Sequence, residues 1–137
     1  ARADAGLGLS SPQLSELEGM SEPYVGKLTR TLRLAGLVQS TRGHKGGYVL
    51  AKAVDAITIN EVLTALGGKL FDQEFCGSHS GMSKLCTNSV DCSVRSLWKM
   101  VQFTLDNLLE KVTLADLMST EGDSNEQLKN ILFTPQV

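Results

Sequence analysis

The stretch SEPYVGKLTRTLRLAGLVQSTRGHKGGYVLA, residues 21–51, decides the fold of this chain. The apolar residues of its first half recur at intervals of three and four, the period of a helix that buries one face. These residues are Val25, Leu28, Leu32 and Ala35. Ser21 is a typical N-cap residue, and Gly36 is typical of the position that ends a helix. The pattern therefore predicts a helix from just after Ser21 to just before Gly36.

The second half of the stretch predicts a hairpin. Two short runs typical of strands, Leu37–Ser40 and Tyr48–Ala51, are joined by the loop TRGHKGG. The glycines of this loop permit the backbone angles that a tight connection needs. Arg42, His44 and Lys45 lie at its tip. A basic hairpin directly after a helix is the pattern of a DNA-binding wing, although an ordinary flexible hairpin has the same pattern.

A shorter helix precedes this stretch. Ser11 is the expected N-cap, Pro12 the first helical residue, and Gly19 the end, with Leu14 and Leu17 as the apolar residues between them. Two short helices joined through Gly-Met-Ser and followed by a basic hairpin favour a winged helix-turn-helix, whose second helix enters the major groove of DNA.

The charges of this region suggest what it binds. Between Glu22 and Gly47 five cations stand against one carboxylate, a net charge of +4, whereas the chain from Tyr48 onward has a net charge of −4. The charge pattern alone favours an ordinary solvated face, but together with the helix and wing it predicts contact with double-stranded DNA. The residues expected to contact DNA are Ser21, Tyr24, Lys27, Arg30, Arg42, His44 and Lys45.

Thr58-Ile59-Asn60-Glu61 is a capping box, which predicts a helix through Leu66. All three cysteines, Cys76, Cys86 and Cys92, then lie in one Gly/Ser-rich stretch, FCGSHSGMSKLCTNSVDC, residues 75–92. Clustered thiolates favour an iron-sulfur centre, a zinc site or redox-reactive thiols. Structural zinc sites usually contain close Cys pairs, and this stretch contains none. His79 is the nearest imidazole and a candidate fourth ligand, or else a solvated side chain.

After Cys92 comes the longest periodic segment. Its apolar residues are spaced alternately by four and three, as in a heptad repeat. They are Val94, Trp98, Val101, Leu105, Leu108 and Val112. A helix facing its own core can show this stripe, but after a small DNA-binding unit we interpret it as a homodimer helix. A short capped helix is expected over Thr113–Met118.

The expected fold is mainly α with a small β-hairpin wing. We divide the chain into a winged helix-turn-helix domain (1–68), a cysteine-rich loop that binds a cluster (69–92), a dimerisation helix with a short following helix (93–118) and a polar, mobile tail (119–137). The chain lacks an apolar run of membrane-spanning length and a signal-peptide pattern, so a cytoplasmic protein is expected. In that reducing compartment an odd number of cysteines favours metal or redox chemistry over disulfides. It has no nucleophile-base motif, so an enzyme is not expected.

The ordered set of motifs resembles the iron-sulfur cluster-binding winged-helix transcription regulators of the IscR/NsrR-like family. The matching residues are Gly19-Met20-Ser21 before Tyr24, Ala35-Gly36-Leu37-Val38, Arg42-Gly43, and Gly46-Gly47-Tyr48-Val49-Leu50-Ala51. Three cysteines between the small and the long helix complete the resemblance, which covers about Leu9 to Met118. It implies a homodimer that binds a pseudo-palindromic operator without crossing or touching a membrane.

The chain departs from the family pattern in several places. Such regulators start with a further helix, and we expect this sequence to begin after it, with that helix either in residues before Ala1 or absent. Nine residues separate Cys76 from Cys86, more than the five common in the family. Arg95 stands where IscR-like members place a histidine ligand, and a guanidinium stays protonated and is a poor ligand. Gly26 and Lys27 stand where relatives often carry Glu and Gln, so the operator is expected to differ.

The resemblance implies a regulator that senses cluster status, redox state or nitric oxide through a cluster on Cys76, Cys86 and Cys92. A 2Fe–2S cluster is preferred over 4Fe–4S, and both repression and activation are compatible with the sequence. One alternative is a winged-helix regulator that responds to a small metabolite without a cluster. The other is a zinc-stabilised protein-interaction module.

Overall fold

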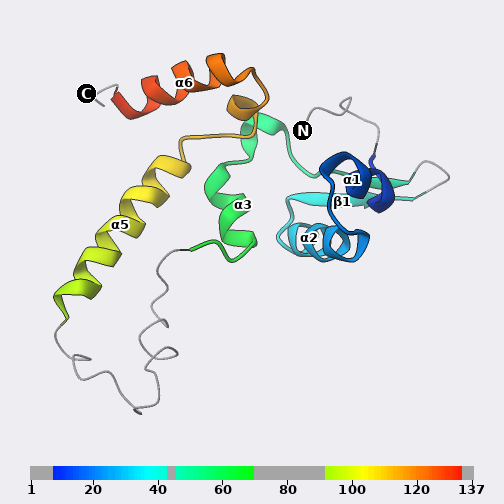
Figure 1. Ribbon diagram of the computed structural model, residues 1–137, viewed down its shortest axis with the longest axis horizontal. Helices are drawn as coiled ribbons and strands as arrows, with labels where there is room; N and C mark the ends of the chain where they lie inside the picture. The colour runs from blue at the N-terminus through cyan, green and yellow to red at the C-terminus, as the bar shows by residue number, and fades with distance from the viewer. Residues whose placement is uncertain (1–7, 43–45, 70–91, 134–137) are drawn as a thin grey trace, which may run out of the picture.

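Figure 1 shows the computed structural model, which describes residues 8–42, 46–69 and 92–133. The elements in these ranges are, in chain order, α1 (Ser11–Glu18), α2 (Glu22–Leu34), β1 (Val38–Thr41), β2 (Gly47–Leu50), η1 (Val54–Ala56), α3 (Ile59–Ala65), α5 (Ser93–Leu109), η2 (Ala115–Leu117) and α6 (Glu121–Phe133). The helices α1 and α2 gather with the hairpin at one end of the molecule, and α3 lies between this group and α5. The architecture is the mainly helical winged helix-turn-helix that the sequence predicts.

The helix-turn-helix is formed by α1 and α2. The N-cap of α1 is Ser10 rather than Ser11, because the Gln13 side chain folds back to accept from the backbone N–H of Ser10 and completes a capping box. Gly19 ends the helix with a φ of 63°, in the left-handed region that favours glycine. Ser21 is the N-cap of α2, as predicted, but its side chain makes no capping hydrogen bond.

One face of α2 forms the core of the winged unit. Val25 and Thr29 are its buried residues, and the Thr29 hydroxyl donates to the Val25 carbonyl at 2.9 Å, which satisfies the buried polar group. Leu37, the residue that enters the hairpin, is buried as well. Of the predicted apolar face, Val25 is buried and Leu28 and Leu32 are half-buried, whereas Ala35 is exposed beyond the end of the helix. The buried Thr29 was not part of the predicted face, because a polar residue does not enter an apolar pattern.

The wing is an antiparallel pair in which Val38 lies opposite Leu50 and Thr41 opposite Gly47. A short segment before α1 joins the pair, because the Leu9 and Tyr48 backbones exchange both hydrogen bonds, at 3.1 and 2.8 Å. Gly47 permits this approach. A Cβ there would lie 2.5 Å from the Leu9 carbonyl carbon, closer than real side chains come.

A second small core forms where α3 begins. Ile57 is fully buried, and the chain around it pairs with the segment after α5: the Ile59 N–H donates to the Val112 carbonyl and the Leu114 N–H to the Ile57 carbonyl. Val112 is therefore buried within its own chain and lies beyond the end of α5. This corrects the predicted apolar seam, whose last member on the helix is Leu108.

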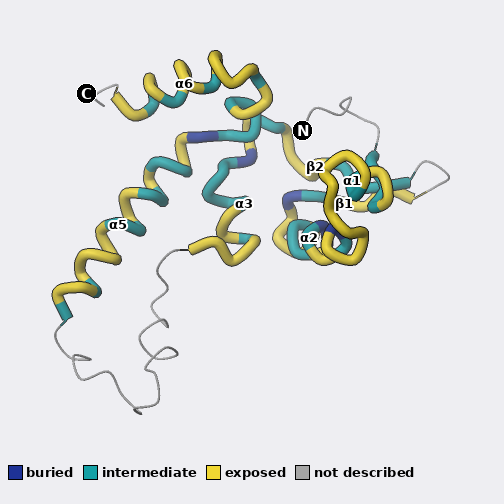
Figure 2. The backbone as a smooth tube through the Cα atoms, viewed as in Figure 1, coloured by how far each residue is buried: buried dark blue, intermediate teal, exposed yellow. Residues whose placement is uncertain are grey.

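The seam along α5 remains accessible to solvent (Figure 2). None of the helix's residues is buried. Val94 and Trp98 are 58% and 44% exposed, and Val101, Leu105 and Leu108 are half-buried. Within the described residues, α5 thus carries an apolar stripe that its own chain covers only partly.

The segment after Ser119, expected to be a polar tail, forms the helix α6. Its start is held by local hydrogen bonds: the Thr120 hydroxyl accepts from the Asp123 N–H, and the Ser124 hydroxyl donates to the Asp116 carbonyl at 3.0 Å. The second bond ties α6 to η2. A short helix was expected over Thr113–Met118, before α6. The structure has only the short 3-10 helix η2 there.

Candidate nucleic-acid interface and cysteine segment

The exposed face of α2 carries the predicted DNA-contacting side chains. Tyr24, Lys27 and Arg30 are exposed, on the side opposite the buried Val25 and Thr29. Ser21 is also exposed, and its hydroxyl is left out of the helix's own capping. The structure therefore brings these four residues to one helix and leaves them accessible.

The base of the wing is held by Thr41. Its hydroxyl accepts from the Gly47 N–H at 3.1 Å and lies 3.3 Å from the Gly47 carbonyl, across the mouth of the loop. Arg42 follows directly and is exposed. His44 and Lys45, the other two predicted contacts of the wing, lie outside the described residues. The described part of the wing thus presents one cation at the start of its tip.

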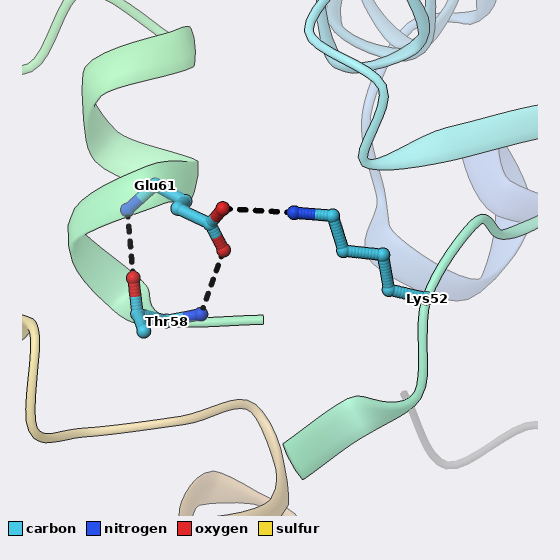
Figure 3. Close-up of polar contacts among 3 residues, drawn as sticks. All are labelled: Lys52, Thr58 and Glu61. Carbon is cyan, nitrogen blue, oxygen red and sulfur yellow. Dashed lines mark hydrogen bonds and ion pairs between the residues drawn. The ribbon is translucent and has the colours of Figure 1, made fainter. Parts of the chain in front are cut away.

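An ion pair connects the end of the wing to α3 (Figure 3). The Lys52 ammonium lies 2.9 Å from Glu61 Oε1, while Glu61 Oε2 accepts from the Thr58 N–H at 3.2 Å. The hydrogen bond from Lys52, followed by that from Thr58, holds the pKa of the Glu61 carboxyl below its ordinary value of 4.5. Glu61 therefore serves both the capping box of α3 and the contact with the wing.

Sequence reasoning predicted the capping box but missed Lys52. The box has a local signature, Thr58 with Glu61 three residues later, whereas no sequence pattern specifies a contact between residues nine positions apart in different elements. The pairing of Leu9 with Tyr48 was missed for the same reason. Its only sequence signal was Gly47, the glycine that the close approach requires.

Of the predicted cluster ligands, the structure describes Cys92. It is a free, half-buried cysteine at the N-cap of α5, and its side chain makes no capping hydrogen bond. Arg95 lies in the first turn of the same helix. Cys76, Cys86 and His79 lie outside the described residues, and the described ranges contain no group of three metal-ligating side chains.

The position of Cys92 fits a ligand of an iron-sulfur cluster. A thiolate is a soft ligand that suits iron and sulfide, and the free N–H groups at the start of a helix favour negative charge beside them. Because Sγ is not used to cap α5, the thiolate could bind metal without disturbing that helix end. Cys92 would also connect such a cluster directly to the apolar stripe of α5.

The fold and these sites can be compared with known proteins. The profile of the Rrf2 family, described as an iron-dependent transcriptional regulator, matches residues 1–120. The chain belongs to the Rrf2 family. The match ends just before α6, so it covers the winged unit, the cysteine segment and α5.

Individual Rrf2 relatives support this assignment. The transcriptional regulator IscR of Erwinia tasmaniensis is 35% identical over 108 residues, which are 79% of this chain and 62% of that protein. The structure of T. potens IscR superposes with a TM-score of 0.60 at 33% identity, covering 81% of this chain and 69% of the other. The chain thus spans a little under two thirds of the length of its curated IscR relative.

A third Rrf2 neighbour is CymR, described as the global cysteine regulator of B. subtilis. Its TM-score is 0.60 at 29% identity, and the match covers 80% of this chain and 77% of CymR. The relatives named here are transcriptional regulators and not enzymes. Among the described helices of this chain, none is long and apolar enough to cross a membrane.

Proposed function

We propose that this Rrf2 chain is a homodimeric transcription regulator that binds an operator in double-stranded DNA and responds to an iron-sulfur cluster on Cys76, Cys86 and Cys92. The exposed cationic face of α2 beside the wing is the observation that carries the DNA-binding part. Tyr24, Lys27 and Arg30 project from the second helix of the helix-turn-helix, the element that enters the major groove in proteins of this architecture.

The proposed dimer rests on α5. Val94 and Trp98 are exposed on a helix of 17 residues, and the stripe continues through Val101, Leu105 and Leu108. A heptad stripe that its own chain covers only partly is typical of a helix that packs against a second helix of the same kind. A two-fold dimer would present two copies of α2, which is why the operator is proposed to be pseudo-palindromic.

The proposed cluster connects the two activities. Cys92 begins α5, and the other two cysteines belong to the segment that joins α3 to α5. Gain or loss of a 2Fe–2S cluster would change this junction, and the Lys52–Glu61 ion pair joins α3 to the wing. DNA as the target and thiolates as the ligands agree with a cytoplasmic protein.

Anaerobic reconstitution tests the proposal. The full chain is expected to bind iron and sulfide in equal amounts, to develop a visible spectrum, and to select a subset of genomic fragments. Cys92→Ala should lose the cluster, while Ser93→Ala, at the adjacent position, should keep it. A reconstituted protein holding zinc without sulfide, and binding no DNA, would instead indicate an interaction module.

His79 is our candidate for the fourth ligand, because three thiolates leave one position open and Arg95 is a poor ligand. A histidine ligand needs a deprotonated ring nitrogen, so the cluster should be lost more readily as the pH falls through the imidazole range. His79→Ala should shift the visible spectrum and speed cluster loss. An unchanged spectrum and lifetime would point to another ligand, such as a carboxylate.

The likeness to CymR favours a second candidate function. CymR is described as a cysteine regulator, so a winged-helix regulator of this type that answers to a small metabolite is the alternative. In that case, replacing the three cysteines would leave operator affinity unchanged under both anaerobic and aerobic conditions. If the variant without the three cysteines loses both the cluster and the cluster-dependent affinity for the operator, this alternative function is excluded.

A further inference from the structure

The winged unit, formed by α1, α2 and the hairpin, is joined to α5 at the beginning of α3. Thr58, which precedes α3, lies opposite Thr113, which follows α5, in an isolated antiparallel bridge. One backbone hydrogen bond flanks this pair on each side, at 2.8 and 3.0 Å, and the adjacent Ile57 and Val112 are buried. A bridge of one residue pair holds two elements at a point, but it does not by itself fix the angle between them.

Two polar contacts on either side of this bridge restrict that angle. Glu61, in the first turn of α3, lies 2.9 Å from the ammonium of Lys52, which follows β2 (Figure 3). Its neighbour Asn60 donates from its side-chain amide to Glu110, at the end of α5, at 3.3 Å. The helix α3 also contacts both α2 and α5, between which it lies. The first turn of α3 is thus bonded to the end of the wing through one residue and to α5 through the next.

We propose that the first turn of α3 sets the distance between the two α2 helices of the dimer, and therefore the spacing of the half-sites that the regulator prefers. The inference rests on the proposed dimer through α5 and on the proposed DNA binding by α2. It makes Lys52, Asn60 and Glu61 positioning residues, which act on DNA through the placement of α2 and the wing.

The geometry of a two-fold dimer explains why this junction matters for DNA. Each winged unit is carried on its own α5, so a rotation at the bridge moves the two α2 helices apart or together. Half-sites read by such a dimer lie about one helical turn of DNA apart, or a multiple of it. Base pairs follow one another about every 3.4 Å, so a displacement of that size changes the preferred spacing. Because α2 lies away from the bridge, a small rotation there is enlarged at α2 (Figure 1).

The exposure of the ion pair favours a role in orientation over a role in holding the fold together. The side chains of Lys52 and Glu61 are 44% and 39% exposed, and exposed ion pairs contribute little to stability. The buried Ile57 and Val112 supply the apolar contact of the junction. Loss of the ion pair should therefore leave the chain folded and change the orientation of the winged unit on α5.

Selection from a DNA pool in which the spacer between two half-sites varies in length tests this inference with the full chain. The parent protein should prefer one spacer length. Lys52→Met removes the ion pair and should reduce that preference about twofold to fivefold, the range expected of one exposed ion pair, with the half-site sequence unchanged. Lys52→Arg keeps the charge and should retain the preference. Lys111→Met, which removes an exposed lysine beside the same bridge, is the matched control and should retain it too.

Asn60 and Glu110 provide an independent measurement on the α5 side of the bridge. Asn60→Ala and Glu110→Ala each remove one partner of the same hydrogen bond, so each should broaden the range of spacers that is bound. The double variant should broaden it no further, because the two residues act through one contact. Additive effects would contradict the role of this contact.

The outcomes separate this inference from the function on which it rests. A parent protein that selects one spacer length, together with variants that select it equally strongly, would overturn the inference. An equal loss of affinity for every spacer in Lys52→Met would overturn it as well, because Lys52 would then contact phosphate instead of positioning α2. A parent protein that binds no DNA, or that binds single half-sites as a monomer, would overturn the proposed function itself, and the inference with it.

Discussion

The helices α2 and α5 are both amphipathic, but they leave opposite faces uncovered. In α2 the apolar face is buried, through Val25, and the cations are exposed. In α5 no residue is buried, and the apolar stripe is exposed at Val94 and Trp98 and half-buried in its later part. An exposed cationic face suits a polyanion, whereas a contiguous exposed apolar stripe is typical of a surface that contacts another apolar surface. The partners proposed for the two helices therefore differ in chemistry.

The largest effect is expected from a charge in the α5 stripe. Leu105→Asp would bury an unpaired carboxylate at the proposed helix-helix contact, which typically costs about 3–5 kcal/mol. We expect sedimentation to show a monomer that keeps its helical circular dichroism. Thr104→Asp, at the adjacent exposed position, should remain dimeric. A Leu105→Asp dimer would mean that the stripe is covered within the chain.

The next prediction contrasts the two faces of α2. Val25→Ala removes buried methyl groups and should lower the free energy of unfolding by about 2 kcal/mol. Lys27→Ala should change it by less than about 0.5 kcal/mol, since exposed substitutions have small effects, yet weaken operator binding. Denaturant unfolding measures the free energy of unfolding of each variant, and a DNA titration measures its operator affinity. Equal losses of stability in the two variants would contradict the assignment of the faces.

A smaller effect is expected at the wing. Arg42→Ala should weaken binding to all DNA sequences alike and reduce the slope of affinity against salt concentration by about one unit. Neutralising Lys45 should do the same if the tip contacts phosphate. Titrations at several salt concentrations provide the slope. An unchanged slope in both variants would remove the wing from the interface.

The smallest effect is expected at Glu61. Its pKa is lowered in the folded chain, so its contribution to stability is present above about pH 4.5 and is lost as the pH falls through the lowered pKa. Glu61→Gln should therefore be less stable than the parent at neutral pH and equally stable in acid. Unfolding curves across that range are the measurement. A difference that persists below the lowered pKa would assign it to packing.

Local patterns predicted most of the winged unit, and tertiary contacts account for the differences. The capping box at Thr58 was predicted because its two partners are three residues apart. The N-cap of α1 was misplaced by one residue because Ser10 and Ser11 are both suitable, and only the Gln13 contact selects Ser10. Val112 continued the spacing of the α5 stripe, but its contact with Ile59 comes from distant sequence.

The tail and the cluster ligands show two further limits of prediction from the sequence. The helix α6 was missed because its composition is polar, although Thr120 and Asp123 form a recognisable helix start. For the cluster, the sequence identified Cys92 as a candidate ligand, and the structure places it at the start of α5. A fourth ligand depends on which side chains meet in space, which residue spacing alone does not determine.

The reciprocal hydrogen bonds between Leu9 and Tyr48 have a consequence for how the winged unit opens. Both amide protons are held by the same pair of residues, one before α1 and one in β2. Neither is released to solvent unless the two segments separate. In native-state hydrogen exchange, the amides of Leu9 and Tyr48 should therefore show one common free energy of opening, as expected if the wing and the entry to α1 open as a single cooperative unit.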